Sequence, residues 1–286
     1  MSRWSERRER LRAVLSANRC VHPGSVFDPI SARVAEDLGF EVGMFAGSIA
    51  SLAVLGAPDI IALTLTEFAA QAYRICRAGN LPLLCDADHG YGNALNVMRT
   101  VEELESAGVA ALSIEDTVLP QPFGSKGQAQ LTSIEEGVGK MRAALQARRD
   151  PNLVIAGRTS AASITGLADA IERATAYAKE GVDAIFLVGV KTRADLDAIA
   201  GEVKLPLILG GVGKELLELA YLGERGVRLC LQGHQPFMAA VQAVQDTLRA
   251  LREGTSPERL QGIASDALMK RLMRNDDYVR WGKDYL

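Results

Sequence analysis

The sequence alternates short apolar runs with longer amphipathic stretches, and this alternation limits the possible folds more than any other feature. Eight apolar runs are separated by stretches with the hydrophobic spacing of helices, several of which end in Gly just before the next run. Such alternation is typical of parallel sheets covered by helices. The runs are CVHPGSVF (residues 20–27), EVGMFAG (41–47), LPLLCDAD (81–88), VAALSIED (109–116), NLVIAGR (152–158), VDAIFLVG (182–189), LPLILGG (205–211) and VRLCLQG (227–233).

The number of runs favours a closed barrel over an open sheet, because eight strand–helix units are what a (β/α)₈ barrel requires. A length of 286 residues suits one such barrel, and no Pro-rich or Ser-rich linker interrupts the alternation. We therefore predict an α/β fold of the (β/α)₈ TIM-barrel type. Residues 1–286 are expected to form a single domain, with residues 254–286 as a C-terminal helical tail.

Charge and hydropathy exclude several classes of partner. A formal net charge of −3 without a sustained basic face argues against nucleic acid as the main partner. The basic start, residues 3–12, is predicted to be a solvated helix. It is not expected to be a secretory signal, because no apolar region follows it. No run approaches the roughly 18 apolar residues of a membrane span, so we expect a cytoplasmic protein with no membrane partner. The four cysteines lack CxxC spacing and are interpreted as buried thiols.

Two segments depart from the regular alternation. Residues 117–132, TVLPQPFGSKGQAQLT, are too long and too rich in Gly, Pro and Gln for a tight turn, which predicts a lid over the strand ends. We call this segment the lid. The tail after residue 253 carries apolar residues beyond a complete barrel, and these need another surface to cover them. A neighbouring subunit is the expected surface.

Polar residues gather where the predicted strands end, which is where (β/α)₈ barrels carry their chemistry. The starts of the strands offer no comparable set. The residues at or near these ends are Asp28, Gly47, Ser48, Asp86, Asp88, Glu115, Asp116, Arg158, Gln232 and His234.

Four carboxylates are candidates for a metal site. Asp86, Asp88 and Glu115, together with Asp59, are expected on one rim, where like charges repel unless a cation neutralises them. An all-oxygen set favours Mg²⁺, with Mn²⁺ as the alternative, over Zn²⁺. The competing interpretation is that these acids cap the following helices or pair with Lys and Arg.

Arg158 and His234 are the candidate groups for binding and catalysis. Arg158 ends a strand and could bind a substrate carboxylate through two hydrogen bonds, or form a structural ion pair with Glu115 or Asp116. His234 begins the last predicted helix, where an imidazole can donate to an anion or move a proton. A lone His is more often a surface or core residue, so this assignment depends on the other site residues.

Taken together, these motifs resemble the isocitrate lyase/phosphoenolpyruvate mutase superfamily over roughly residues 20–245. DADHGYG (residues 86–92) is similar to its metal motif, SIED (113–116) to its next carboxylate, VFDPISARVAEDLGFE (26–41) to its opening and GRTSA (157–161) to its arginine strand. The resemblance implies a Mg²⁺-dependent enzyme that acts on α-keto acids or forms their enolates. It also implies a homotetramer, a dimer of dimers, in which a C-terminal helix swaps between neighbours.

Within the superfamily the lid points to one branch. Its LPQPFGSKGQ stretch lacks the catalytic cysteine of the isocitrate and methylisocitrate lyases, and resembles instead the FG-containing lid of the oxaloacetate decarboxylases. GYGNALNVMRTVEELE (residues 90–105) and the dipeptide Gly233-His234 are similar to that branch as well. The resemblance implies substrate contacts at Ser48, Arg158 and His234 and a metal at Asp86. Two departures are Val212, where the branch tends to have Tyr, and Ser160, where Asn is usual.

We therefore expect decarboxylation of oxaloacetate to pyruvate and CO₂ through an enolate that the metal stabilises. Arg158 and the backbone at Gly47 and Ser48 would hold the substrate, while His234 would orient the leaving carboxylate or protonate the enolate. An alternative is another reaction of the superfamily on an α-keto acid or substituted malate, such as carbon–carbon cleavage or phosphonopyruvate hydrolysis. A barrel that binds a metabolite without catalysis is a third hypothesis.

Overall fold

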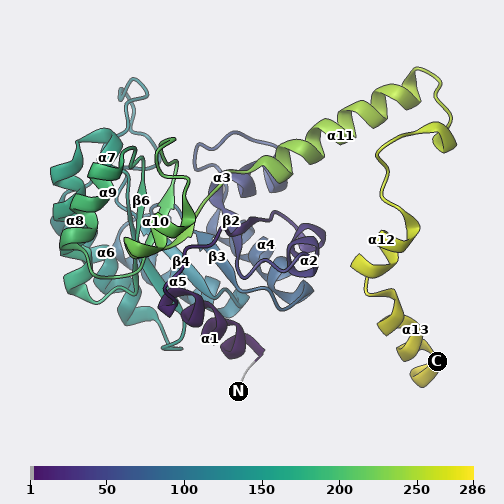
Figure 1. Ribbon diagram of the computed structural model, residues 1–286, viewed down its shortest axis with the longest axis horizontal. Helices are drawn as coiled ribbons and strands as arrows, with labels where there is room; N and C mark the ends of the chain where they lie inside the picture. The colour runs from purple at the N-terminus through teal and green to yellow at the C-terminus, as the bar shows by residue number, and fades with distance from the viewer. Residues whose placement is uncertain (1–2) are drawn as a thin grey trace.

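The computed structural model describes residues 3–286 and contains eight parallel strands in a single sheet ordered β1 to β8 along the chain (Figure 1). Val21, just before β1, pairs in parallel with Leu229 of β8, which brings the two edges of the sheet together. The predicted (β/α)₈ fold is therefore confirmed. The strands are β1 (Gly24–Ser25), β2 (Gly43–Ala46), β3 (Leu83–Asp86), β4 (Ala111–Glu115), β5 (Val154–Thr159), β6 (Ala184–Val188), β7 (Leu207–Gly210) and β8 (Val227–Cys230).

Helices on the outside of the sheet bury their apolar faces against it. In α5 (Ala94–Ala107), for example, the Asn93 side chain caps the first turn, and Val97, Val101 and Leu104 are fully buried on one face. Gly108 then ends the helix in the left-handed conformation. The other outer helices are α2 (Pro29–Asp37), α4 (Leu65–Ala78), α6 (Ile134–Ala147), α8 (Leu167–Glu180), α9 (Arg193–Glu202) and α10 (Leu219–Glu224), with short turns at α3 (Gly47–Ala50), η1 (Ser51–Leu55) and α7 (Ala161–Ile164).

The basic N-terminal helix α1 (Arg3–Ser16) is not the solvated helix that the sequence predicted. Its Leu11 and Leu15 belong to the cluster of apolar side chains contributed by the strands, together with residues such as Leu84 and Val154. Arg7 and Arg8 are only 2% and 3% exposed. The prediction was wrong because charge was taken as a sign of exposure, whereas these guanidiniums bind carbonyl oxygens near the ends of neighbouring helices.

The contacts of Arg8 illustrate how this charge is satisfied. Its Nε donates to the carbonyl of Val109 at 3.0 Å, and its terminal nitrogens donate to the carbonyl of Glu105 and the carboxylate of Asp150, each at 2.7 Å. Buried charges persist when they are paired and hydrogen-bonded in this way. Helix α1 therefore covers the end of the barrel opposite the strand ends that carry the candidate site.

The C-terminal part of the chain projects away from the barrel (Figure 1). Helix α11 (Gln235–Arg252), which follows β8, has no buried residue, so the projecting part begins before the tail predicted at residue 254. Beyond η2 (Pro257–Arg259), helix α12 (Asp266–Leu272) returns to α2, where Arg33 donates to the carbonyl of Leu272 at 2.8 Å. Helix α13 (Asn275–Tyr285) ends the described chain.

Two further predictions concern cysteines and membranes. All four cysteines are buried thiols, as expected, and burial raises the pKa of Cys230 to about 11. None of the helices between residues 3 and 286 is long and apolar enough to cross a membrane.

Replacing Leu11 with Ala should test the role of α1 in stability. We expect Leu11→Ala to lower the free energy of unfolding by about 2–5 kcal/mol, because it leaves a cavity in a fully buried cluster. Urea unfolding followed by circular dichroism measures the loss. The matched control is Leu217→Ala, at a position 66% exposed, which should change stability by less than about 0.5 kcal/mol. Equal losses in the two variants would contradict the packing role of α1.

Candidate active site

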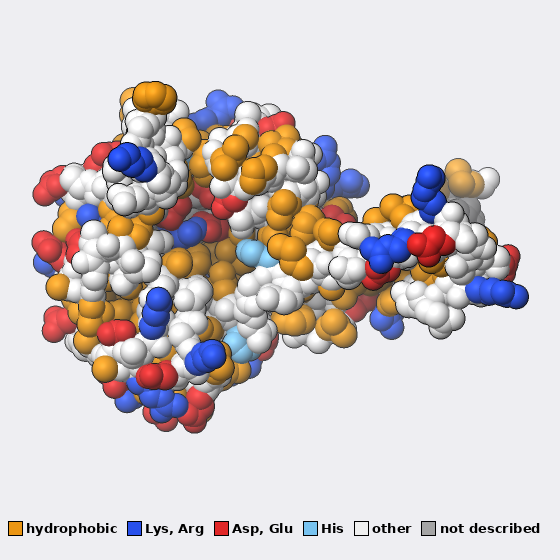
Figure 2. Space-filling view, turned by 90° about the horizontal axis from the view of Figure 1, so that it is seen from above, with side chains coloured by type: hydrophobic (Ala, Val, Ile, Leu, Met, Phe, Trp, Pro, Cys, Tyr) orange, Lys and Arg blue, Asp and Glu red, His pale blue; other side chains and the backbone are white. Residues whose placement is uncertain are grey.

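A cavity of about 360 Å³ lies at the carboxyl ends of the strands. Figure 2 views the molecule from above and shows a central hollow in the barrel with acidic and basic side chains around it. Six of the predicted strand-end or metal residues line this cavity, together with residues of the lid. The lining residues are Ser48, Asp59, Ile61, Asp86, Asp88, Glu115, Thr117, Leu119, Gln121, Ala129, Arg158, Ser160, Ser163 and Ile164.

Three strand ends form the floor of the cavity. Asp86 ends β3 and Glu115 ends β4, while Arg158 in β5 is directly in register with Glu115. The guanidinium of Arg158 donates to the Asp86 carboxylate and lies 3.3 Å from Oε2 of Glu115. Ser113 Oγ donates to the other oxygen of Asp86 at 3.0 Å. Because these side chains come from adjacent parallel strands, their ion pairs form without any loop having to place them.

Arg158 therefore forms the ion pair with Glu115 that was considered from the sequence. It also forms an ion pair with Asp86, which was not considered from the sequence. It does not pair with Asp116. The guanidinium also lies 5.3 Å from the ring centroid of Phe186, and its Nε has no hydrogen-bond partner among the described residues. The Nε of Arg158 is thus buried without a hydrogen-bond partner in the described part of the chain even while both ion pairs are formed.

Asp88 reaches the cavity through an unusual backbone conformation. Its φ of 49° lies in the left-handed region, and its carbonyl accepts the N–H of Glu115 at 2.8 Å. A Cβ at position 47 would lie only 2.3 Å from Oδ2 of Asp88, so Gly47 provides space for this carboxylate. Asp88, predicted as a metal residue, and Gly47, predicted as a substrate residue, are therefore in contact.

The acids of the cavity carry more negative charge than Arg158 can neutralise. Burial raises the pKa of Asp88 well above its usual range, and the charges of Asp86 and Glu115 raise it further. Burial is also the main cause of the raised pKa values of Asp59 and Glu115. Burial alone would lower the pKa of Arg158, but Asp86 and Glu115 outweigh it and raise that pKa. This imbalance favours a bound cation.

The predicted metal residues share the cavity but do not form a closed ligand set. Among residues 3–286 no three His, Cys, Asp or Glu side chains are grouped so that they could hold one metal ion. Two of the four acids, Asp86 and Glu115, instead contact Arg158. The donor chemistry, four carboxylates and no sulfur or imidazole among the lining residues, still suits a hard divalent cation.

His234 lies at the start of α11 rather than in the cavity wall. Its Nδ1 is 2.9 Å from Oγ of Ser25, which fixes the orientation of the ring. Burial lowers the pKa of His234, while the charges of Asp86 and Asp59 act in the opposite direction. His234 is therefore close enough to the acidic floor to interact with it electrostatically.

Several polar strand-end residues have other roles. Asp28 caps α2 by accepting the N–H of Ser31 at 2.7 Å, and Gln232 lines a groove beside α2. Of the two departures from the decarboxylase branch, Ser160 lines the cavity, whereas Val212 packs against the core and is not a lining residue.

Sequence reasoning missed Ile61, Ser163 and Ile164 as lining residues. Ile61 has a φ of 60°, which is rare for a β-branched residue and which no local sequence pattern signals. Thr117, Leu119, Gln121 and Ala129 belong to the lid, so the sequence did indicate their segment but not which of its residues face the cavity.

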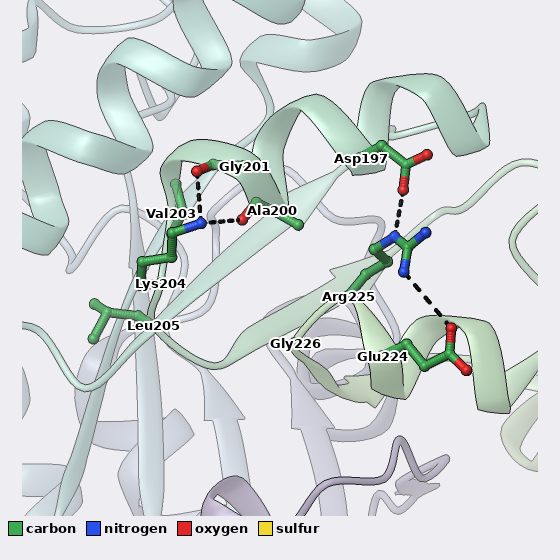
Figure 3. Close-up of a pocket in the computed structure, with 9 residues that line it drawn as sticks. All are labelled: Asp197, Ala200, Gly201, Val203, Lys204, Leu205, Glu224, Arg225 and Gly226. Carbon is green, nitrogen blue, oxygen red and sulfur yellow. Dashed lines mark hydrogen bonds and ion pairs between the residues drawn. The ribbon is translucent and has the colours of Figure 1, made fainter.

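A second pocket, of about 470 Å³, lies between α9 and the α10–β8 turn (Figure 3). Its charged groups satisfy one another or the backbone. Arg225 pairs with Asp197 at 2.5 Å and with Glu224 at 3.6 Å, and Lys204 donates to two carbonyls of α9. This pocket therefore offers no unpaired charge comparable to the acids at the strand ends.

Comparison with known proteins identifies close relatives. Residues 11–252 match the family model described as phosphoenolpyruvate phosphomutase. A protein of Rhodopseudomonas palustris (strain BisB18) named oxaloacetate decarboxylase is 62% identical over 99% of this chain and 98% of its own length. A protein of the same name from Bradyrhizobium diazoefficiens (strain JCM 10833 / BCRC 13528 / IAM 13628 / NBRC 14792 / USDA 110) is 59% identical, with the same coverage.

Solved structures show the same fold over nearly the whole chain. A phosphonopyruvate hydrolase in complex with oxalate and Mg²⁺ has a TM-score of 0.85 and 29% identity, and covers 98% of this chain and 99% of its own. An oxaloacetate acetylhydrolase bound to the inhibitor 3,3-difluorooxalacetate has a TM-score of 0.86 and 27% identity, with coverages of 98% and 97%. The resemblance predicted from the motifs is therefore confirmed, and the chain belongs to the phosphoenolpyruvate phosphomutase family within the isocitrate lyase superfamily.

Proposed function

We propose that this chain is an oxaloacetate decarboxylase, a carboxy-lyase that converts oxaloacetate to pyruvate and CO₂ in the cavity at the strand ends. The observation that carries the proposal is that four carboxylates and Arg158 line one cavity, in a chain 62% identical to a protein of that name. A dianionic keto acid needs both features. The arginine would bind the carboxylate that stays, and a cation held by the acids would stabilise the negative charge left when the other carboxylate departs as CO₂.

A divalent cation is part of the proposal. Asp86, Asp88, Glu115 and Asp59 are the residues that would hold it, with Mg²⁺ preferred and Mn²⁺ as the alternative for an all-oxygen set. When bound, the cation supplies Lewis-acid stabilisation of the negative charge that develops as CO₂ departs. Holding it requires Arg158 to give up at least part of its contact with Asp86 and Glu115.

Arg158 is then positioned to bind the substrate. Released from its acids, its guanidinium can donate two parallel hydrogen bonds to the carboxylate next to the keto group. The backbone at Gly47, which lies next to Asp88, and at Ser48, which lines the cavity, would complete the hold on the same carboxylate. Without substrate, Arg158 contacts the carboxylates of Asp86 and Glu115. The substrate carboxylate would replace these protein carboxylates as the partner of Arg158.

His234 acts on the far carboxylate or on the product carbon. Burial lowers its pKa, which favours the neutral ring near pH 7, and a neutral imidazole can orient the leaving carboxylate by one hydrogen bond. To protonate the enolate it would first have to take up a proton. Ser25 holds the ring in place for either role.

The proposal extends to a homotetramer, a dimer of dimers. Helix α11 carries a stripe of exposed apolar residues, including Val241, Val244 and Leu248, and Figure 2 shows hydrophobic side chains where this arm leaves the barrel. An apolar groove of about 670 Å³ beside α2 stays open in the single chain. An α11 from a second copy would cover such a groove, as the swapped helix of the resemblance implies.

The assay that tests the activity is pyruvate release from oxaloacetate with Mg²⁺, corrected for spontaneous and metal-catalysed background. We expect turnover by the wild type, a loss of at least about 100-fold in Asp86→Ala, and a marked loss in His234→Ala. The matched control is Asp197→Ala, in the pocket of Figure 3, which should keep wild-type turnover. Wild-type turnover at background level would refute the decarboxylase assignment and direct attention to substituted malates and phosphonates.

Metal binding can be tested without turnover. Mg²⁺ at about 100 times its Kd should stabilise the wild type by about 2.7 kcal/mol, seen as a raised Tm, because a ligand of the native state stabilises that state. Asp88→Asn, which keeps the shape of the side chain, should abolish most of this shift. Asp197→Asn should show the full shift. An unchanged Tm in the wild type would speak against the metal site and in favour of a barrel that binds no cation.

The assembly has its own test. Val244→Asp places a charge on the apolar stripe of α11 and should convert the tetramer into smaller species in analytical ultracentrifugation, because burying an unpaired carboxylate is costly. Gln242→Asp introduces the same charge on the opposite side of the helix and should leave the tetramer intact. Dissociation of both variants, or of neither, would contradict a role for this stripe in assembly.

A further inference from the structure

The lid, residues 117–132, leaves and rejoins the barrel through a closed base. Thr117 and Leu131 form an antiparallel bridge, and the N–H of Val118 donates to the carbonyl of Gln130 at 2.8 Å. Below this pair the N–H of Thr132 donates to the carbonyl of Asp116, also at 2.8 Å. The first and last residues of the lid are therefore held side by side.

A buried polar trio lies directly beneath this base. Asp116, from the end of β4, and Tyr177, from α8, are both 0% exposed, and Arg173 of α8 is 7% exposed. The hydroxyl of Tyr177 donates to Oδ2 of Asp116 at 2.6 Å, and Nη1 of Arg173 lies 3.1 Å from the same oxygen. The same Nη1 donates to the carbonyl of Thr132 at 2.9 Å. A single guanidinium thus links the residue before the lid to the residue at its end.

The surrounding fold makes room for this trio. A Cβ at Gly137, inside α6, would lie 2.3 Å from the Tyr177 hydroxyl, and a Cβ at Gly157, in β5, would lie 3.1 Å from Cβ of Tyr177. Glycine is unfavourable inside both helices and strands. Glycine at both positions therefore leaves space for the Tyr177 side chain, although glycine lowers the local preference for helix and strand.

The position of the base determines where the lid meets the cavity. Thr117, the first residue of the lid, donates from Oγ1 to Oε2 of Glu115 at 2.9 Å. Leu119, Gln121 and Ala129, further along the lid, line the cavity wall. A shift of the base would move all of these residues relative to Glu115 and Arg158.

We infer that Arg173 and Tyr177 are positioning residues, which clamp the base of the lid through Asp116 and thereby set the wall of the substrate cavity. Neither residue lines that cavity. They act on the reaction only through the lid, so they should affect substrate binding more than the chemical step. The kinetic part of this inference rests on the proposed decarboxylase function, whereas its structural part does not.

The chain offers a matched control trio. Tyr221 Oη lies 2.8 Å from Oδ1 of Asp197, and Arg225 donates to the same oxygen at 2.5 Å. This trio has the same residue types, and its Asp197 and Arg225 line the pocket of Figure 3, away from the lid. The test variants are therefore Arg173→Lys and Tyr177→Phe, and the controls are Arg225→Lys and Tyr221→Phe.

Native-state amide hydrogen exchange of residues 117–132 tests the clamp without reference to activity. In Tyr177→Phe and Arg173→Lys the amides of Val118 and Thr132 should exchange about tenfold faster, the effect of losing one buried hydrogen bond, while strand amides keep wild-type protection. In the decarboxylase assay KM should rise about fivefold with kcat within about twofold of wild type. Both control variants should match the wild type in lid exchange and in KM.

Three results would overturn the inference: unchanged lid exchange in both test variants, equal acceleration of strand and lid amides, or equal effects in the control variants. Tyr177→Phe removes a single oxygen and keeps the ring, so it remains informative if Arg173→Lys fails to fold. Faster lid exchange in an enzyme that does not decarboxylate oxaloacetate would uphold the clamp and reject the proposed function instead.

Discussion

The ion pairs of Arg158 with Asp86 and Glu115 hold together a site that would otherwise repel itself. Parallel strands that close into a barrel bring all their carboxyl ends to one rim, so acids at successive strand ends become neighbours. Burial raises the pKa values of Asp88, Glu115 and Asp59, and repulsion from neighbouring carboxylates raises them further. A cation and an anionic substrate can bind at this rim together. The cation would neutralise the acids, and the substrate would neutralise the arginine that had been paired with them.

The two ends of the barrel use arginine in different ways. Helix α1 covers one end, where Arg8 binds backbone carbonyls and Asp150, so that every contact stabilises the fold. At the opposite end Arg158 lines the cavity and pairs with Asp86 and Glu115, two of the acids that line it as well. Arg173 is intermediate, since it is buried like Arg8 but contacts the end of the lid, a segment expected to move. This arrangement separates the parts that provide stability from those that provide function.

The single chain does not cover all of its apolar surface. The helix that follows β8 would complete the outer layer of a self-contained barrel, yet α11 extends away and buries none of its residues. It leaves an apolar groove beside α2 and carries an apolar stripe of its own. His234 lies at the start of this helix and contacts Ser25 on the groove wall, so the groove and the candidate active site share a boundary.

The sequence alone determined the barrel and most of the cavity floor, because strand periodicity shows which residues end each strand and closure brings those ends together. Asp86, Asp88, Glu115, Arg158 and Ser48 were all predicted and all line one cavity, and Asp59 joins them. The tertiary structure alone decided that α1 is buried, that Arg158 contacts two acids, that Ile61 faces the cavity and that Arg173 reaches the end of the lid. Most of these features depend on contacts between residues far apart in the chain, and Ile61 on a backbone conformation that no local pattern signals. Local patterns encode which face of an element is apolar, but the partner of a buried charge is set only when distant elements pack.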